Sequence, residues 1–70
     1  MMKITGNTIK EHRAELEMSQ QALADYCGVD CDMIDNVEQN RIVPSLELAA
    51  TIAVCLDAPL AMLFSFDKTA

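Results

Sequence analysis

Polar side chains that could do chemistry gather in one short stretch of this chain, Asp30-Cys31-Asp32-Met33-Ile34-Asp35-Asn36. Carboxylates at this density could hold a cation. A Ca²⁺ loop, however, needs six or more oxygen ligands and a glycine at its bend, and the stretch supplies neither. On a helix, moreover, residues two apart face different directions, so that only Asp32 and Asp35 could share an ion. We therefore expect no metal site here.

Three cysteines, Cys27, Cys31 and Cys55, offer a second kind of chemistry. Their odd number argues against a disulfide scaffold in a cytoplasmic protein. A zinc site would need a fourth ligand at suitable spacing, and the single histidine, His12, lies far up the chain. We expect Cys27 and Cys55 to be small core residues, Cys31 to be exposed, and the protein to hold no cofactor.

Short helices must position these groups, because apolar residues recur at helical spacing between turn signals and no segment predicts a strand. The turn signals are Gly28, Asn40, Pro44 and Asp57-Ala58-Pro59. We expect five helices: one from about Asn7 to Leu16, one from Ser19 to Gly28, one capped by Asp30, one capped by Ser45, and one that begins at Pro59. Asp57 is expected in a left-handed conformation, which Asp tolerates better than most residues.

The second and third of these helices are joined by a tight turn. The Ser19 hydroxyl can accept from the free N–H groups of the first turn of its helix. Gly28 can end that helix, since the left-handed conformation is cheap only for glycine. Asp30 then starts the next helix, where a carboxylate is favoured by the helix dipole. The whole has the outline of a helix-turn-helix.

Size and composition limit what these helices can form. The chain has 70 residues, of which 51% are hydrophobic, enough for one packed domain. No apolar run approaches the roughly 20 residues that cross a bilayer, so we expect no membrane contact. The start of the chain lacks the apolar segment of a secretory signal, and we expect a cytoplasmic protein.

The order and spacing of these residues resemble the phage-repressor/Cro-type (XRE-like) helix-turn-helix family. The resemblance extends from about Ile4 to Phe66. Its pieces are Arg13, the run Met18 to Ala24, Cys27-Gly28-Val29, Ile34, Val37-Glu38, the run Pro44 to Ala49, Ile52-Ala53, Leu56 and Leu63-Phe64. It implies one domain over residues 1–70, with its core about 4–66, folded as an all-α compact five-helix bundle. It also implies a transcriptional regulator that binds double-stranded DNA, usually as a dimer.

The resemblance also implies roles for individual residues. The third helix would be the recognition helix in the major groove. The positions that face the bases are Cys31, Asp32, Asp35 and Asn36. The positions that meet the phosphate backbone are Gln20, Asn40 and Arg41. Arg13 and Glu38 match a structural ion pair that joins the first and third helices.

The net charge of the chain argues against DNA binding. Five basic and eleven acidic side chains give a net charge of −6, whereas nucleic-acid-binding domains are normally basic. An aspartate can nevertheless accept from the amine of cytosine, and Asn36 can bind adenine through a bidentate pair. One interpretation is a specific but weak DNA binder, acting as a repressor. The alternative is a protein-interaction module that has lost DNA binding and attracts a basic partner through its acidic face.

The apolar C-terminal segment predicts self-association. Its large side chains exceed what a small core easily covers, and an exposed apolar patch indicates a partner surface. They are Leu60, Met62, Leu63, Phe64 and Phe66. We expect a twofold homodimer through the last helix. An enzyme is not expected, because the chain has no histidine paired in register with a cysteine or serine, and no glycine-rich phosphate loop.

Overall fold

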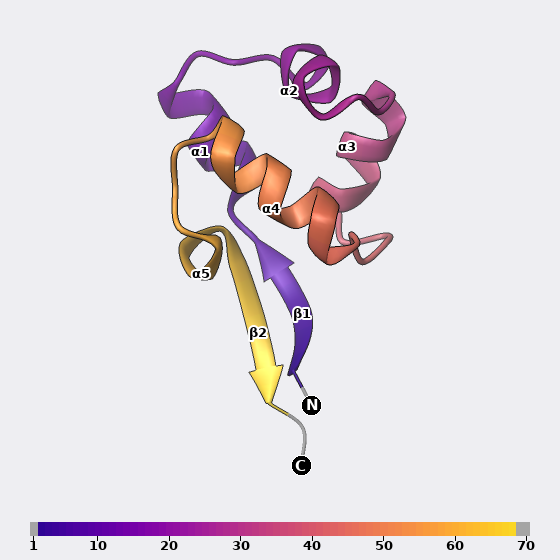
Figure 1. The fold of residues 1–70 in the computed structure, drawn as a ribbon, viewed down its shortest axis with the longest axis vertical. Coiled ribbons are helices and arrows are strands. Elements are labelled where there is room, and N and C mark those ends of the chain that lie inside the picture. Colours follow the sequence, from indigo (N-terminus) through magenta and orange to yellow (C-terminus); the bar gives the residue numbers. More distant parts are fainter. Residues whose placement is uncertain (1, 69–70) are drawn as a thin grey trace.

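The computed structural model describes the backbone of residues 2–68 and the side chains of residues 4–67. Along the sequence over that range, five helices come between two strands. In space, the two strands lie side by side and the helices gather at one end of them (Figure 1). The elements are β1 (Met2–Asn7), α1 (Ile9–Glu15), α2 (Gln20–Cys27), α3 (Cys31–Glu38), α4 (Leu46–Cys55), α5 (Leu60–Leu63) and β2 (Phe64–Lys68). The domain expected over residues 1–70 includes residues 1, 69 and 70, which lie outside the described range.

The expectation of an all-α fold without strands is wrong at the two ends of the chain. β1 and β2 pair antiparallel, with Ile4 opposite Phe66 and Asn7 opposite Phe64, and the register shifts between Ile4 and Gly6. Phe64, which helical spacing assigns to the last helix, is the first residue of β2. Both segments alternate apolar and polar residues, Met2-Lys3-Ile4-Thr5 and Phe64-Ser65-Phe66-Asp67, which is a strand signal that the helical interpretation missed. The signal is short, the pairing joins opposite ends of the sequence, and a two-stranded pair is marginal by itself. The two strands extend away from the helices as a ribbon (Figure 1).

Three of the predicted helix starts are confirmed by their caps. The Ser19 hydroxyl accepts from Ala22 N at 3.0 Å, the Asp30 carboxylate from Met33 N at 2.8 Å, and the Ser45 hydroxyl from Leu48 N at 3.1 Å. Each cap satisfies an N–H group that the first turn of the helix leaves without an intrahelical acceptor.

The first helix begins later than expected because the end of β1 determines its start. Asn7 lies in β1, and its Oδ1 accepts from Ile9 N at 3.2 Å. Thr8 is the N-cap residue, but its hydroxyl donates to Met62 O at 3.0 Å instead of capping the helix. This contact ties the start of α1 to α5, which has only four residues.

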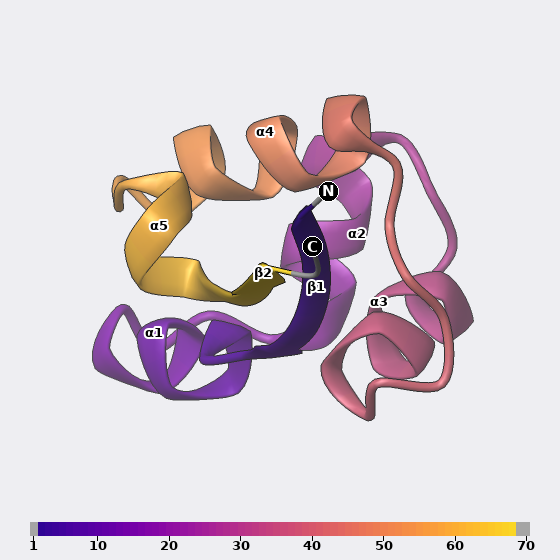
Figure 2. The same cartoon turned by 90° about the horizontal axis from the view of Figure 1, so that it is seen from below.

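The core lies among the helices, which are arranged around the line of the two strands (Figure 2). The buried apolar side chains are Ile9, Leu23, Ala24, Ile34, Val37, Ala49, Ile52, Ala53, Leu56, Leu63 and Phe64. Cys27 and Cys55 pack against this core and are half-buried. No helix within residues 2–68 is long and apolar enough to cross a membrane.

The expected apolar patch at the C-terminal end is mostly absent. Leu63 and Phe64 are buried, whereas Leu60 and Phe66 are half-buried against the core. Met62 is 64% exposed. The small core therefore covers more of this segment than its composition predicts, because β2 folds back along β1.

Candidate nucleic-acid interface

The turn between α2 and α3 depends on the backbone of Gly28. Gly28 has φ +72°, in the left-handed region, and Val29 N donates back to Ala24 O at 3.0 Å. A Cβ added at Gly28 would meet no atom within 4 Å. Glycine is therefore required by backbone conformation, not by space. The turn is followed by Asp30 in extended conformation, which starts α3 at an angle to α2.

Helix α3 has a buried side and an outer side. Ile34 and Val37 are buried in the core, and Asp32 is exposed. Asn36 lies one turn after Asp32 and is half-buried, so the two side chains share a face of the helix. Cys31 is half-buried, not exposed as expected, because its Sγ lies 3.7 Å from Gln20 Oε1.

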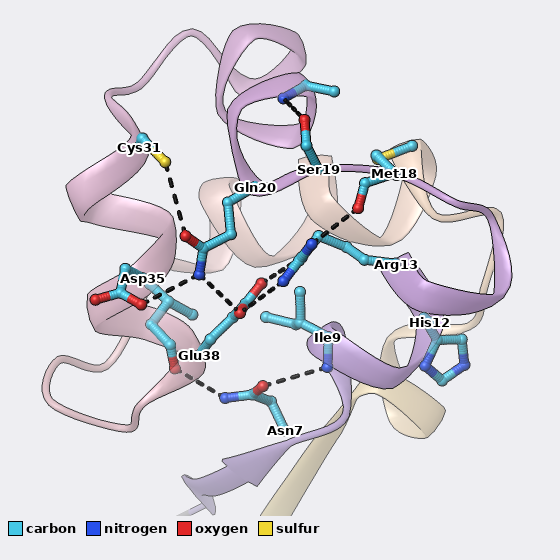
Figure 3. A network of polar contacts seen from close by, with 12 residues as sticks. Asn7, Ile9, His12, Arg13, Met18, Ser19, Gln20, Cys31, Asp35 and Glu38 are labelled. Atoms are coloured by element: carbon cyan, nitrogen blue, oxygen red, sulfur yellow. Dashed lines mark hydrogen bonds and ion pairs between the residues drawn. The ribbon is translucent and has the colours of Figure 1, made fainter.

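The amide of Gln20, the first residue of α2, is used inside the protein. Its Nε2 donates to Asp35 Oδ1 at 3.1 Å and to Glu38 Oε1 at 3.0 Å (Figure 3). An amide has two hydrogens, and both are occupied. The side chain therefore holds α2 against α3. At the start of α2 the N–H group of Ala22 is capped by Ser19, whereas those of Gln20 and Gln21 precede the first intrahelical bond and remain suitable for an anion.

Arg13 and Glu38 form an ion pair that joins α1 to α3 (Figure 3). Arg13 Nε lies 2.6 Å from Glu38 Oε2, and Nη2 lies 3.1 Å from Oε1. Arg13 Nη1 also donates to Met18 O at 2.8 Å, in the loop between α1 and α2. The two side chains are 13% and 4% exposed. A bidentate pair at this depth fixes the end of α3 against the rest of the bundle.

Asp35 receives donors from two different elements. Its Oδ1 accepts from Gln20, and its Oδ2 lies 3.3 Å from Nη1 of Arg41, which follows α3. The hydrogen bond from Gln20 is the largest cause that lowers the pKa of Asp35 below its ordinary value. Desolvation opposes this effect, whereas the charge and the hydrogen bond of Arg41 add to it. Asp35 is therefore ionised at neutral pH.

The loop after α3 is supported by a residue that sequence reasoning missed. Asn7 Nδ2 donates to Val37 O at 2.8 Å and to Asn40 Oδ1 at 3.1 Å. Asn40 has φ +60°, so the chain turns sharply there and presents Arg41 at the surface. An asparagine before a helix indicates a local cap, but nothing in the sequence indicates its bonds to residues 30 and 33 positions away.

The match with known proteins settles the family. The family model described as helix-turn-helix matches residues 9–63, which include all five helices. This chain is a helix-turn-helix protein. The XRE-type resemblance drawn from the sequence is thereby confirmed.

Several archaeal proteins resemble this helix-turn-helix chain. An uncharacterized HTH-type transcriptional regulator of Archaeoglobus fulgidus is 40% identical over 60 residues, which cover 86% of this chain and 84% of that protein. A protein of the same description from Methanothermobacter thermautotrophicus is 46% identical over 48 residues, covering 69% and 70% of the two chains. A putative HTH-type transcriptional regulatory protein of Methanococcus vannielii is 39% identical over 59 residues, 84% of this chain but 18% of that longer protein.

The helix-turn-helix carries little positive charge. Arg41 is the only Lys or Arg between residues 14 and 67. Its guanidinium lies against Asp35 Oδ2 and, at 3.4 Å, against Asn36 Oδ1. The side chain is 61% exposed, so it stays accessible to an anion from solution. The outer side of α3 thus combines two exposed or half-exposed hydrogen-bonding groups, Asp32 and Asn36, with one cation.

Proposed function

We propose that this helix-turn-helix protein is a small, sequence-specific DNA-binding regulator of transcription, acting as a repressor, with α3 as its recognition helix. The observation that carries the proposal is the placement of Asp32 and Asn36 on one outer face of a helix held rigidly from behind. The ion pair of Arg13 and Glu38 and the amide of Gln20 fix that helix. The family and the regulatory descriptions of the archaeal relatives support it.

The proposed base contacts follow from hydrogen-bonding type. The Asp32 carboxylate would accept from the amine of a cytosine, and Asn36 would bind an adenine with both ends of its amide. Cys31 and Asp35 flank them at the groove. Each well-made contact discriminates against the wrong base by about 1–3 kcal/mol.

The proposed backbone contacts come from the first turn of α2 and from the loop after α3. At Gln20 the backbone N–H groups offer a phosphate site, since the amide is engaged with Asp35 and Glu38. Asn40 and Arg41 lie at the other end of α3. With Arg41 as the accessible cation of the helix-turn-helix, we expect weak general affinity and a salt slope no steeper than about −1 per protomer, because each neutralised phosphate contributes about −0.9.

Selection from a randomised duplex pool at low salt tests this function. We expect the wild-type protein to enrich a defined site, and Asp32→Ala and Asn36→Ala each to relax preference at one base position. Asp25→Ala is the matched control, since Asp25 is an exposed carboxylate on α2 bonded to Gln21. It should leave the preference unchanged. Failure of the wild-type protein to retain any duplex would end the DNA assignment.

A second candidate function follows from the charge of the same face. Asp30, Asp32 and Asp35 lie at the start and along the outer side of α3, and Arg41 is already paired with one of them. Such a face attracts basic partners. Salt-sensitive binding of a lysine-rich peptide, together with no binding of duplex DNA, would favour the protein-interaction module over the regulator.

We also propose that the protein acts as a homodimer through the region of α5. Leu16 and Met62 are 49% and 64% exposed, and both line a hollow of about 300 Å³ that also includes Pro59. Burying these side chains in a twofold interface would remove apolar surface from water. Sedimentation of the wild-type protein and of a Leu16→Glu, Met62→Glu variant tests this. A monomeric wild type at all concentrations contradicts the dimer.

A further inference from the structure

The Asp35 carboxylate accepts hydrogen bonds from two side chains that the proposed function places near DNA. Its Oδ1 accepts from the Gln20 amide at 3.1 Å, and its Oδ2 from the Arg41 guanidinium at 3.3 Å. One carboxylate thus joins the start of α2 to the loop after α3, across the outer side of α3. A DNA phosphate would present oxygens of the same charge to the same donors.

The contact matters because Arg41 is the one cation in the sequence of the helix-turn-helix. It is the only Lys or Arg between residues 14 and 67, and phosphate neutralisation supplies most of the non-specific affinity for DNA. The pair is exposed, at 61% for Arg41 and 38% for Asp35. An ion pair in this setting opens at small cost, so Arg41 can exchange one anion for another.

We propose that Asp35 is a positioning residue for Arg41 and not a base-reading residue: it holds the guanidinium against α3 and competes with DNA phosphate for it. This inference rests on the proposed function. It reassigns Asp35 from the predicted base contacts, because both of its oxygens are engaged within the protein. Asn36 shares the guanidinium at 3.4 Å and would keep Arg41 near the groove after Asp35 releases it.

The test is the affinity of a fixed non-specific duplex over a series of salt concentrations. For Asp35→Asn we expect about a fivefold gain at low salt, the effect of freeing the unit charge of Arg41 to act on a phosphate about 4 Å away in water. We expect the salt slope to steepen toward about −0.9 per protomer, because Arg41, no longer paired with Asp35, then neutralises a phosphate. Asn keeps an oxygen for the Gln20 amide, and a melting curve checks that the fold is retained.

Two further variants distinguish a positioning role of Asp35 from a simple effect of its negative charge. Asp25→Asn makes the same change in net charge on α2 and should leave both affinity and slope unchanged. In an Arg41→Gln protein, Asp35→Asn should give a smaller gain and no change in slope. An equal gain with and without Arg41, or no gain at all, overturns the inference.

The outcomes also distinguish the inference from the proposed function. If the wild-type protein binds duplex DNA and the effect of Asp35→Asn does not depend on Arg41, only the positioning role of Asp35 fails. If neither the wild-type protein nor Asp35→Asn retains any duplex at low salt, the proposed function and the inference fail together.

Discussion

At the scale of single residues, buried charge is the feature with the largest consequences. Glu38 is 4% exposed and accepts from both Arg13 and Gln20. A buried pair of this kind adds little net stability, because desolvation offsets the attraction. Loss of one partner is different, since it leaves the other charge buried and uncompensated.

Arg13→Ala should therefore damage folding before it affects any surface contact. We expect the free energy of unfolding to fall by roughly 3–5 kcal/mol, measured by urea titration. Lys10→Ala is the control, because Lys10 is exposed on the same helix. If Arg13→Ala melts at the wild-type temperature, the contact with Glu38 does not support the fold.

The lowered pKa of Asp35 predicts how the stability of the fold depends on pH. Its pKa is lowered in the folded protein, so its contribution to stability is present above the unfolded pKa and is lost as the pH falls through the folded pKa. Because Gln20 is the first cause of this lowering, Gln20→Ala should raise the pKa of Asp35 toward its ordinary value. Carbon NMR of the carboxyl group measures it. An unchanged pKa in Gln20→Ala would show that the hydrogen bond is absent in solution.

At the scale of elements, left-handed residues set the helix ends. Gly28 ends α2 at φ +72°, and Asp57 follows α4 at φ +51°, as its sequence context predicts. Glu17 has φ +54° in the loop between α1 and α2, although nothing in its side chain favours that conformation. A left-handed residue other than glycine costs roughly 1–2 kcal/mol.

Removing the glycine at position 28 and introducing one at position 17 should change the free energy of unfolding in opposite directions. Gly28→Ala should lower the free energy of unfolding by roughly 1–2 kcal/mol, through the backbone alone, because the added Cβ meets nothing. Glu17→Gly should raise it by about 0.5–1 kcal/mol, since relief of strain exceeds the entropy that glycine adds to the unfolded chain. Thermal unfolding of both variants measures the pair, and shifts of the same sign would contradict this explanation.

At the scale of the whole molecule, the two ends of the chain close the fold. β1 and β2 bring Ile4 opposite Phe66, and Thr8 N donates to Leu63 O at 2.8 Å. The strand pair also places Asn7 beside the loop that carries Arg41, where its Nδ2 donates to Asn40 Oδ1. The candidate interface at one end of α3 therefore depends on strands formed from both termini.

Two phenylalanines of β2 should differ in their contribution. Phe64 is 2% exposed in the core. Phe64→Ala should lower the free energy of unfolding by about 3–5 kcal/mol, enough to leave a large fraction of the molecules unfolded in a domain of this size. Phe66 is half-buried, and Phe66→Ala should cost about 1–2 kcal/mol. Urea unfolding compares them, with Phe64→Leu as a milder variant that should stay folded. Equal losses would mean that β2 is not ordered as described.

The sequence by itself determined the helix starts at Ser19, Asp30 and Ser45 and the turn at Gly28. Each depends on hydrogen bonds or backbone angles within a few residues, so local residue types were sufficient to predict them. The pairing of β1 with β2 and the contacts of Asp35 with Gln20 and Arg41 were decided only by the tertiary structure. These contacts join residues that are distant along the chain or lie on different elements, and their donors and acceptors have no local pattern that identifies the partner.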